Sequence, residues 1–387
     1  MKKALICLLV ALNLFALCPK AEELEITSEA AILIDAETGQ ILYEKNKDEK
    51  LYPASITKIM TIYLAALQNT PDQVITASET AIRAVPNDTS NIALDYGEQI
   101  TMEQAMYAAM LMSANDACNV LAEGVSGSIE AFTDLMNQTA REFGALNTNF
   151  ANANGLIDEN HYTTAYDFAA ITRNAIQNPE FFRIFTSMEY SIPPTNKKSV
   201  SRNFYAQHRM MHQSQYAQYG VVGGKAGYTQ ESQHTLVTYG EKNGFQLIAV
   251  TLKNPAFNAI YQDTQKLLDF GYEQFERVEI SASEIQPKVE GLTTWTPSGS
   301  VRCLLRKGET AAQVIAEYSD DAVALYSPRF EYLGSMPVEK VTTTPVWKTV
   351  MKTIGIVLVV LVVLILVLYM IIIIRSHQKR KRRRKSR

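Results

Sequence analysis

The chain has 387 residues, of which 47% are apolar and 20% are charged, and its formal net charge is −3. A chain of this length and composition buries one or two hydrophobic cores, so it is not an intrinsically disordered protein. The charge is unevenly distributed, because removing the nine Lys and Arg residues of the C-terminal tail and the two N-terminal lysines leaves about −14. Such an acidic body excludes nucleic acid as the expected partner.

The first residues have the pattern of a secretory signal peptide. Lys2 and Lys3 precede an apolar run from Ala4 to Leu17, and Ala21 is a small residue suited to a cleavage site. This order of charge, apolar run and small residue is typical of export signals. We therefore expect residues 1–21 to be a signal peptide and the body of the chain to be exported.

The elements of the body follow in chain order from apolar runs and turn residues. The expected strands are Ala31 to Asp35, Gln40 to Tyr43, Thr235 to Tyr239 and Phe245 to Leu252. The expected helices are Ser55 to Leu67, Thr101 to Met112, Asp116 to Glu123 and Ile260 to Phe275. Hairpins are expected at Glu37-Thr38-Gly39 and at Asn243-Gly244. Strands at both ends, with helices between them, predict an antiparallel sheet built from distant parts of the chain.

The pattern changes after the last of these helices. Residues 278–341 form short segments with β-branched residues, broken by turns that contain proline and glycine, and this predicts a small all-β domain. The expected organisation is a main domain at residues 25–275 followed by this β domain. Cys118 and Cys303, the cysteines within these domains, are expected to be unpaired, because two distant cysteines make no framework of disulfides.

An uninterrupted apolar stretch of 21 residues, Ile354 to Ile374, lies near the C-terminus. At about 1.5 Å per residue, a helix of this length crosses a hydrocarbon core of roughly 30 Å. Nine Lys or Arg residues follow it within residues 375–387, as expected on the cytoplasmic side of a membrane. We therefore expect a linker at 342–353, one C-terminal transmembrane helix, a basic cytoplasmic tail at 375–387 and a body outside the cell membrane.

Ser55 and Lys58 form the first pair of residues that indicates chemistry. In the first turn of a helix, positions three apart share a face, so the lysine amine lies beside the serine oxygen. A serine nucleophile needs a partner that takes its proton, and Lys58 does so only when its amine is neutral, which burial or a nearby positive charge favours. Lys225 is the candidate source of that charge. A serine and a lysine at this spacing also occur by chance about once in a chain of this length.

Two later strings supply what this pair lacks. The Ser113 hydroxyl is suited to passing a proton to a leaving amine, and the Asn115 amide to holding both the lysine and a substrate carbonyl. The alternative, which is compatible with this role, is that both residues cap the helix expected at Asp116. Lys225 offers a positive charge to a substrate carboxylate, and Gly227 allows a ligand backbone to approach closely. An exposed lysine on a strand is the alternative for Lys225.

These strings and their neighbours resemble a known family, the penicillin-recognising serine D-alanyl-D-alanine carboxypeptidases. These peptidase S11-like enzymes are the low-molecular-mass penicillin-binding proteins of bacterial cell walls. The segments similar to the family are Tyr52 to Lys58, Met112 to Ala117, Asn154 to Leu156, His161 to Asp167 and Lys225 to Thr229. The resemblance covers Glu25 to Phe275 well and the β domain more loosely. It implies a penicillin-binding, β-lactamase-like α/β fold: an antiparallel sheet with flanking helices and a helical subdomain.

The resemblance also implies an activity and the residues that perform it. Ser55 attacks the D-Ala-D-Ala peptide carbonyl, Lys58 is the base, and Ser113 and Asn115 assist, without a metal or another cofactor. The residues implied to bind the substrate are Lys225, Gly227, Tyr228 and Thr229. The backbone N–H groups of Ser55 and Tyr228 are implied to form the oxyanion hole. The implied partners are the peptidoglycan stem peptide and β-lactam antibiotics, which acylate the serine.

Three features depart from that family. Ala226 stands where the family has a threonine or serine whose hydroxyl binds the terminal carboxylate, and losing that bond costs about 1.5 to 3 kcal/mol unless Thr229 compensates. An arginine expected after the following strand is not evident, and Lys253 is the nearest cation. The family often anchors by an amphipathic helix on the membrane, whereas Ile354 to Ile374 is expected to span it.

Several other functions stay open. They are a catalytically weak penicillin-binding or wall-binding protein, which Ala226 favours, a D,D-endopeptidase or transpeptidase, and a β-lactamase, for which no glutamate motif is evident. Metal hydrolysis is disfavoured because the five His residues form no His-Glu-x-x-His string, and His208 and His212 are expected at the surface. A phosphate-binding loop at Gly220 to Lys225 is excluded because Tyr219 occupies the position of its first glycine.

Overall fold

The structure, a computed structural model, describes residues 24–68, 70–285, 295–318 and 322–340, together with four isolated positions near the C-terminus. The predicted signal peptide at 1–21, linker at 342–353 and basic tail at 375–387 lie outside these residues. So does the predicted span at 354–374, apart from the four isolated positions. Among the helices of the described residues, none is long and apolar enough to cross a membrane.

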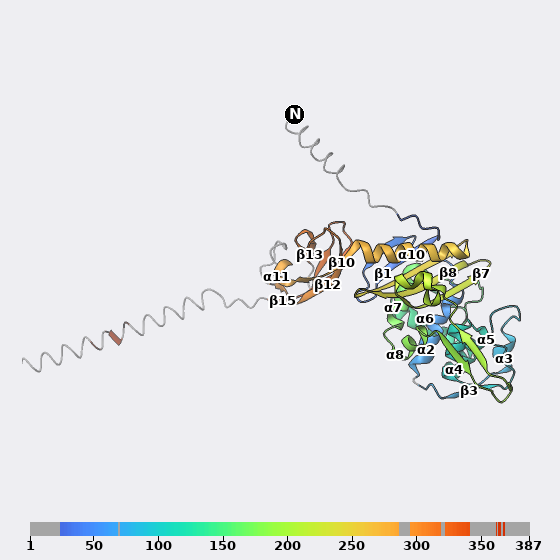
Figure 1. The fold of residues 1–387 in the computed structure, drawn as a ribbon. Helices are drawn as coiled ribbons and strands as arrows, with labels where there is room; N and C mark the ends of the chain where they lie inside the picture. The colour runs from blue at the N-terminus through green and yellow to red at the C-terminus, as the bar shows by residue number, and fades with distance from the viewer. Residues whose placement is uncertain are drawn as a thin grey trace, which may run out of the picture. The chain divides into compact units, whose positions relative to one another are not determined.

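A five-stranded antiparallel sheet is the central element of the fold (Figure 1). Its order is β2-β1-β9-β8-β7, with bounds Ile41–Lys45, Ala30–Asp35, Phe245–Asn254, Gln233–Lys242 and Val221–Thr229. Strand β1 pairs with β9, so the two ends of the main domain are neighbours in space. The predicted antiparallel sheet, assembled from distant parts of the chain, is confirmed.

Turn chemistry shapes two of the three hairpins of this sheet. The Asp35 carboxylate accepts hydrogen bonds from the Thr38 N–H and hydroxyl at 2.9 and 2.7 Å. Gly39, in the same turn, has a φ of 79°, which costs a glycine nothing because it lacks a Cβ. Between β8 and β9, Asn243 and Gly244 have φ values of 53° and 80°. Two successive positive φ values are the geometry of the tight type I′ turn, which matches the twist of the paired strands.

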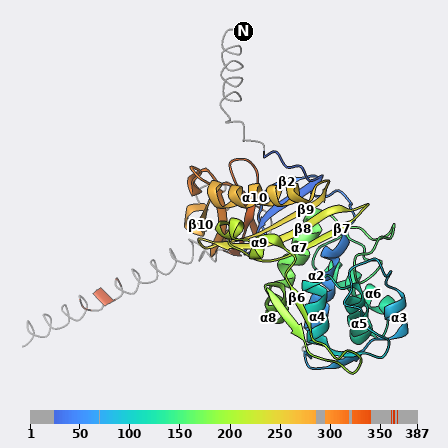
Figure 2. The same ribbon diagram turned by 45° about the vertical axis from the view of Figure 1, so that its right-hand side comes forward.

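Helices cover both faces of the sheet (Figure 2). Successive side chains of β1 point to opposite faces, so Leu33 joins the core beneath α10, Phe257–Gln274, whereas Ile32 joins the core of the helical subdomain. Burial on both faces explains why β1 is a continuous apolar run rather than an alternating one.

The helical subdomain lies across the sheet from α10 (Figures 1 and 2). Its α-helices are α2 Lys58–Leu67, α3 Glu79–Arg83, α4 Met102–Leu111, α5 Asn115–Ser126, α6 Ile129–Glu142, α7 Ala165–Ala175 and α8 Pro179–Phe185. The 3-10 turn η1 Ala54–Thr57 precedes α2. The short helix α9 Arg209–His212 and the 3-10 turn η2 Ser214–Tyr219 lie on the α10 face instead, where Met210 and Tyr219 join the core beneath α10. The short strands are β3 Val74–Thr76, β4 Gln99–Thr101, β5 Glu189–Ile192 and β6 Arg202–Tyr205. The helix predicted from Ser55 to Leu67 therefore begins with a 3-10 turn.

The last described residues are mainly β-strands. The strands are β10 Phe275–Ser281, β11 Trp295–Pro297, β12 Ser300–Arg306, β13 Ile315–Tyr318, β14 Ala322–Tyr326 and β15 Tyr332–Lys340. A short helix, α11 Ala282–Ile285, and a 3-10 turn, η4 Ala311–Gln313, lie among them. The chain divides into two compact units, one of which holds the residues up to Ile280 with Val301–Ile315 and Leu325–Gly334. The boundaries expected from the sequence, 25–275 and 278–341, stay predictions.

Candidate active site

Ser55 lies in η1, immediately before α2. Ala54 has a left-handed backbone with a φ of 51°. The turn packs against Gly155, where a Cβ would lie 2.0 Å from the Ala54 carbonyl oxygen, so only glycine fits at this point. The Ser55 side chain is partly accessible, whereas the neighbouring Ile56 and Thr57 are buried. The Ser55 hydroxyl is thus accessible on a turn that packing against Gly155 holds in place.

Lys58 is the first residue of α2 and is fully buried. Its Nζ lies 2.9 Å from Ser55 Oγ and 2.8 Å from Asn115 Oδ1, and it also contacts the Asn154 carbonyl oxygen. Burial lowers the pKa of Lys58 to about 8. A neutral amine has two N–H donors and one lone pair. The two carbonyl oxygens take the donors, which leaves the lone pair for the Ser55 hydroxyl.

Lys225 brings a second amine into the same buried region. Its Nζ donates to Ser113 Oγ at 3.1 Å and to the Ala226 carbonyl at 2.9 Å. Burial first, and the charge of Lys58 second, lower the pKa of Lys225 to about 7. The hypothesis that Lys225 provides the charge that depresses the pKa of Lys58 needs correction, because burial is the principal cause for both lysines. Because two positive charges in this region repel each other, the two lysines are not readily protonated at the same time near neutral pH.

Ser113 and Asn115 lie at the break between α4 and α5. Ser113 has a left-handed backbone with a φ of 56°, and its hydroxyl accepts from Lys225. The N-cap of α5 is Ala114, which has no capping side chain, and the Asn115 N–H donates to the Ser90 carbonyl at 2.8 Å. The alternative that Ser113 and Asn115 cap this helix is therefore wrong. Their side chains contact the two lysines instead.

The backbone of β7 approaches the nucleophile at Gly227. A Cβ at this position would lie 2.7 Å from the Ser55 backbone nitrogen and 2.6 Å from Thr235 Oγ1. Any larger residue would displace η1, so the glycine follows from packing as well as from access for a ligand. Strand β7 is at the edge of the sheet, so its outer backbone groups are available to a peptide that adds as a strand.

Two of the departures from the family pattern, at Ala226 and at the expected arginine, are not compensated by Thr229 or by Lys253. Tyr228 is 62% exposed. The Thr229 hydroxyl donates to Ser232 Oγ at 2.8 Å in the turn after β7, so it does not replace the hydroxyl that Ala226 lacks. Lys253, the nearest cation in the sequence to the expected arginine, forms an ion pair with Glu29 at 2.8 Å.

A pocket of about 460 Å³ opens beside Ser55, a volume within the range of small-ligand sites. Ser90 and Ser113 line one part of it. Another part is a wall of four rings in successive contact, with centroid distances of 4.6, 5.4 and 5.6 Å: Tyr228, His234, Phe257 and Tyr261. The pocket therefore joins the nucleophile to an aromatic surface.

His161 is a site residue whose role the sequence pattern did not reveal. It is buried, its Nε2 lies 2.8 Å from Thr57 Oγ1, and its Nδ1 accepts the Ala151 N–H at 3.0 Å. Because Nδ1 accepts a backbone proton, we assign the ring proton to Nε2, which donates to Thr57. Burial lowers the pKa of His161 to about 4, so the ring is neutral. His161 thereby ties η1 to the loop whose Asn154 carbonyl contacts Lys58.

Asp116 is a second positioning residue that the sequence pattern did not reveal. Its buried carboxylate accepts the backbone N–H groups of Ile92 and Leu94 at 3.1 and 3.0 Å. These bonds hold the loop that carries Ser90 against α5. The only available signal was its position directly after Asn115.

Two further expectations concern histidine and cysteine. His208 is buried rather than at the surface, because its Nε2 lies 2.8 Å from Thr238 Oγ1 and its ring packs against Tyr261. Cys118 and Cys303 are free and buried, as expected. Burial raises the pKa of the Cys118 thiol to about 11, so it is not an activated nucleophile.

Comparison with known proteins identifies the family of this chain. The family model described as Peptidase S11, D-alanyl-D-alanine carboxypeptidase, matches residues 18–256. D-alanyl-D-alanine carboxypeptidase DacF of Bacillus subtilis (strain 168) is 30% identical over 369 residues, which cover 88% of this chain and 91% of the relative.

Solved structures are also similar to this chain. Penicillin binding protein 5 from Haemophilus influenzae has a TM-score of 0.67 at 25% identity and covers 82% of this chain and 97% of that one. The Streptomyces K15 DD-transpeptidase has a TM-score of 0.60 at 25% identity and covers 64% of this chain and 97% of that one. With its penicillin-binding α/β fold, this chain belongs to the peptidase S11 family of D-alanyl-D-alanine carboxypeptidases and is a serine hydrolase.

Proposed function

We propose that the chain releases the terminal D-alanine from peptidoglycan stem pentapeptides through an acyl-enzyme on Ser55. The observation that supports this most strongly is the position of the buried Lys58 amine, 2.9 Å from Ser55 Oγ. An amine with a pKa of about 8 lies close to the operating pH, where a general base is most effective.

The proposed reaction has two stages. The Ser55 oxygen attacks the carbonyl carbon of the D-Ala-D-Ala bond while its proton passes to Lys58. The backbone N–H groups of Ser55 and Tyr228 stabilise the oxyanion, where one lost donor typically costs about 3 to 4 kcal/mol. The C–N bond breaks as the leaving amine receives a proton through Ser113. Water then hydrolyses the ester and restores the Ser55 hydroxyl.

Lys225 is proposed to face the terminal carboxylate of the substrate. In the free protein its pKa is about 7, because burial and Lys58 disfavour its charged form. A carboxylate beside Lys225 favours the charged form, so substrate binding protonates this lysine. Lys58 keeps the pKa of about 8 that its burial gives it, so it remains available as the base for Ser55. Gly227, Tyr228 and Thr229 are proposed to complete this binding edge.

A second candidate function, a catalytically weak penicillin-binding or wall-binding protein, is favoured by Ala226. Its methyl group offers no hydrogen bond to a carboxylate, and Thr229 is engaged with Ser232. Introducing the hydroxyl with Ala226→Thr is expected to lower the KM for a D-Ala-D-Ala peptide about tenfold, from a bond worth about 1.5 to 3 kcal/mol. Wild-type protein that turns over the peptide as fast as the variant argues against any such loss.

We also propose that the enzyme is held at the outer face of the cell membrane by its C-terminus. The apolar stretch Ile354 to Ile374 and the nine cations after it support this orientation, as does the N-terminal signal pattern. A tether restricts the enzyme to wall material close to the bilayer. In intact spheroplasts, added protease should digest the main domain and spare an epitope placed after Arg387. Digestion of that epitope would contradict the proposed orientation and support the opposite one.

Mass spectrometry of a peptidoglycan pentapeptide incubated with the full-length chain tests the proposed reaction. We expect loss of one alanine with the wild type and none with Ser55→Ala. A fluorescent penicillin should label the wild type and not the variant. Labelling without release of alanine supports the second candidate. If the wild type is not labelled and releases no alanine, both candidate functions are contradicted. An added amine or a cross-linked peptide distinguishes transpeptidase and endopeptidase activity by the product formed.

A further inference from the structure

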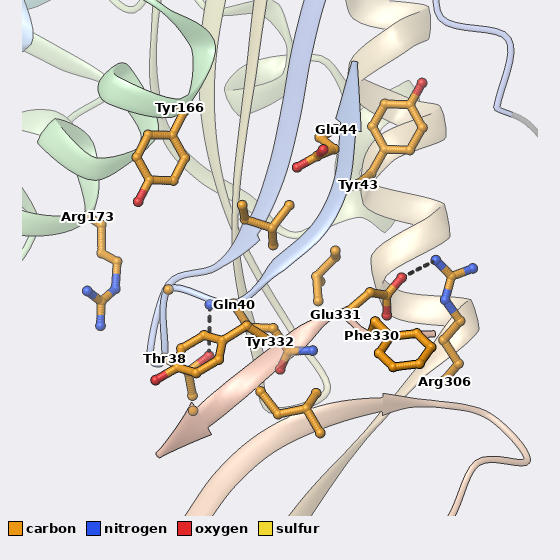
Figure 3. Close-up of a pocket in the computed structure, with 15 residues that line it drawn as sticks. Thr38, Gln40, Tyr43, Glu44, Tyr166, Arg173, Arg306, Phe330, Glu331 and Tyr332 are labelled. Carbon is orange, nitrogen blue, oxygen red and sulfur yellow. Dashed lines mark hydrogen bonds and ion pairs between the residues drawn. The ribbon is translucent and has the colours of Figure 1, made fainter. Parts of the chain in front are cut away.

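A second pocket lies apart from Ser55. It has a volume of about 770 Å³ and shares no lining residue with the pocket beside the nucleophile. The β1–β2 hairpin at residues 38–44 lines it, together with Tyr166 and Arg173 from α7 and with Arg306 and residues 330–334 (Figure 3). We call it the hairpin pocket. No step of the proposed reaction uses it.

Hydrogen bonds hold the walls of the hairpin pocket in place. The buried amide of Gln40 accepts the Leu304 N–H at 2.8 Å and donates to the Leu304 carbonyl at 2.7 Å. Arg173 Nε and Nη2 donate to the carbonyls of Ala36 and Glu37 at 3.0 and 2.8 Å. These bonds fix the hairpin against both β12 and α7. The pocket is therefore formed before any ligand arrives, which reduces the ordering cost of binding.

Three aromatic rings are exposed on the lining of the hairpin pocket. Tyr166, Phe330 and Tyr332 are 39%, 72% and 55% exposed. Phe330 also has a left-handed backbone with a φ of 65°, an outlier for a bulky residue. The Ser327 N–H donates to the Glu331 carbonyl at 2.8 Å, and the Phe330 N–H donates to Ser327 at 2.9 Å, so the turn is held in this strained form. An exposed ring kept in a strained conformation indicates a contact function.

The charged side chains that line the hairpin pocket balance, with two acids and two bases. Arg306 pairs with Glu331 at 3.0 Å, and Glu44 pairs with Lys47 at 3.0 Å, while Arg173 bonds the hairpin carbonyls. All four lining charges are thus engaged within the protein. An ionic ligand gains little from such a lining, whereas a neutral ligand with many hydroxyl groups still finds donors and acceptors beside the rings.

We propose that the hairpin pocket binds the glycan backbone of the cell wall, with pyranose rings against Tyr332, Phe330 and Tyr166. The C–H groups on one face of a pyranose pack on an aromatic ring and point at its negative face, while the ring hydroxyls hydrogen-bond at the rim. This inference rests on the proposed function, because stem peptides are attached to the same glycan. Holding the glycan raises the effective concentration of stem peptides near Ser55.

A binding experiment tests the pocket without any peptide. A soluble oligomer of N-acetylglucosamine is titrated into the full-length protein by calorimetry. Phe330→Gly, which removes the ring and also relieves the backbone strain, and Tyr332→Ala are each expected to weaken binding about tenfold. Tyr205→Ala removes an exposed tyrosine of β6, outside the pocket, and should leave binding unchanged. No binding by the wild type, or equal binding by all variants, overturns the proposal.

A second measurement separates this proposal from the proposed reaction. Phe330→Gly and Tyr332→Ala should release D-alanine from a soluble pentapeptide at the wild-type rate, but more slowly from intact peptidoglycan. Ser55→Ala should bind the oligomer normally while releasing no alanine. Equal rates of the ring variants and the wild type on intact peptidoglycan contradict the glycan site. Alanine release by Ser55→Ala contradicts the reaction and leaves the glycan site standing.

Discussion

Two buried polar clusters in this protein differ in how well they stabilise a charged side chain. In the first, the Asp263 carboxylate of α10 accepts the backbone N–H groups of Thr27 and Ser28 at 3.0 and 2.7 Å. It also accepts the Ser28 hydroxyl at 2.7 Å and the Asn254 amide at 2.9 Å. One charge is thus surrounded by donors, and these bonds tie the segment before β1 to α10 and to the end of β9.

In the second cluster, the amines of Lys58 and Lys225 are buried and form no ion pair among the residues that the structure describes. Their hydrogen-bond acceptors are hydroxyls and carbonyls, all of them neutral. Among the described residues, no carboxylate forms an ion pair with either lysine. Burial consequently lowers both pKa values.

The difference separates structural from reactive polar clusters. A buried charge whose lone pairs are all satisfied contributes to the folded state, and removing it leaves donors unpaired. Two buried amines without an ion-pair partner among the described residues detract from stability, yet they supply a base whose pKa lies near physiological pH. We therefore expect substitutions in the first cluster to change stability and substitutions in the second to change chemistry.

The largest effect is expected for Lys58→Met. It removes the proposed base, so acylation of Ser55 by a fluorescent penicillin should slow about 100- to 10,000-fold. The free energy of unfolding at neutral pH should not fall, because a buried amine is replaced by an apolar side chain of similar length. Acylation within a few-fold of the wild-type rate would show that Lys58 is not the base.

Asp263→Ala tests the structural cluster. Several buried donors lose their acceptor, so the free energy of unfolding should fall by about 3 kcal/mol in denaturant titration. The acylation rate of the folded protein should be unchanged. Asp269→Ala, on the same helix at a partly exposed position, is the matched control and should change stability little. A loss of acylation in folded Asp263→Ala would remove the distinction between the clusters.

The pH dependence of acylation follows from the lowered pKa of Lys58. Only the neutral amine accepts a proton, so the rate should rise with pH and level off above about 8. Below that value it should fall about tenfold for each pH unit, in proportion to the neutral fraction. Circular dichroism over the same range excludes unfolding as the cause. A rate that is flat between pH 6 and pH 8 is inconsistent with a lysine base of this pKa.

Lys225→Met should stabilise the fold by about 1 to 2 kcal/mol at neutral pH while weakening peptide binding. The pKa of Lys225 is lowered from 10.5 to about 7 in the folded chain, so the unfolded chain binds more protons between these values. Wild-type stability therefore rises with pH across this window. The advantage of the variant should shrink toward pH 10.5, and a pH-independent difference would point to packing alone.

Much of the fold and of the site follows from local pattern. The hairpin at Glu37-Thr38-Gly39 and the Asn243-Gly244 turn were predictable because positive φ values demand particular residues. Ser55 and Lys58 were predictable because a spacing of three within a helical turn brings side chains together. The break at Ser113 was visible as an interruption between two apolar helical segments.

Other features had no local signal. His208 and His212 have helical spacing, but this spacing does not reveal that His208 is buried and contacts Thr238 of β8. His161 gains its role only because Thr57 and the Ala151 loop arrive from different parts of the chain. The hairpin pocket combines β1–β2 with residues almost three hundred positions later. No spacing rule predicts such contacts.

Residue order thus established which groups were available for chemistry, since hydroxyls, amines and turn glycines are fixed by covalent structure and short-range sterics. Tertiary packing determined the pKa values, and therefore the protonation states, of these groups. Lys58 and Lys225 are ordinary cations in an unfolded chain and become weakly basic only when the sheet and the helical subdomain exclude water from both. Desolvation depends on everything that surrounds a group, and that environment exists only after distant segments have met.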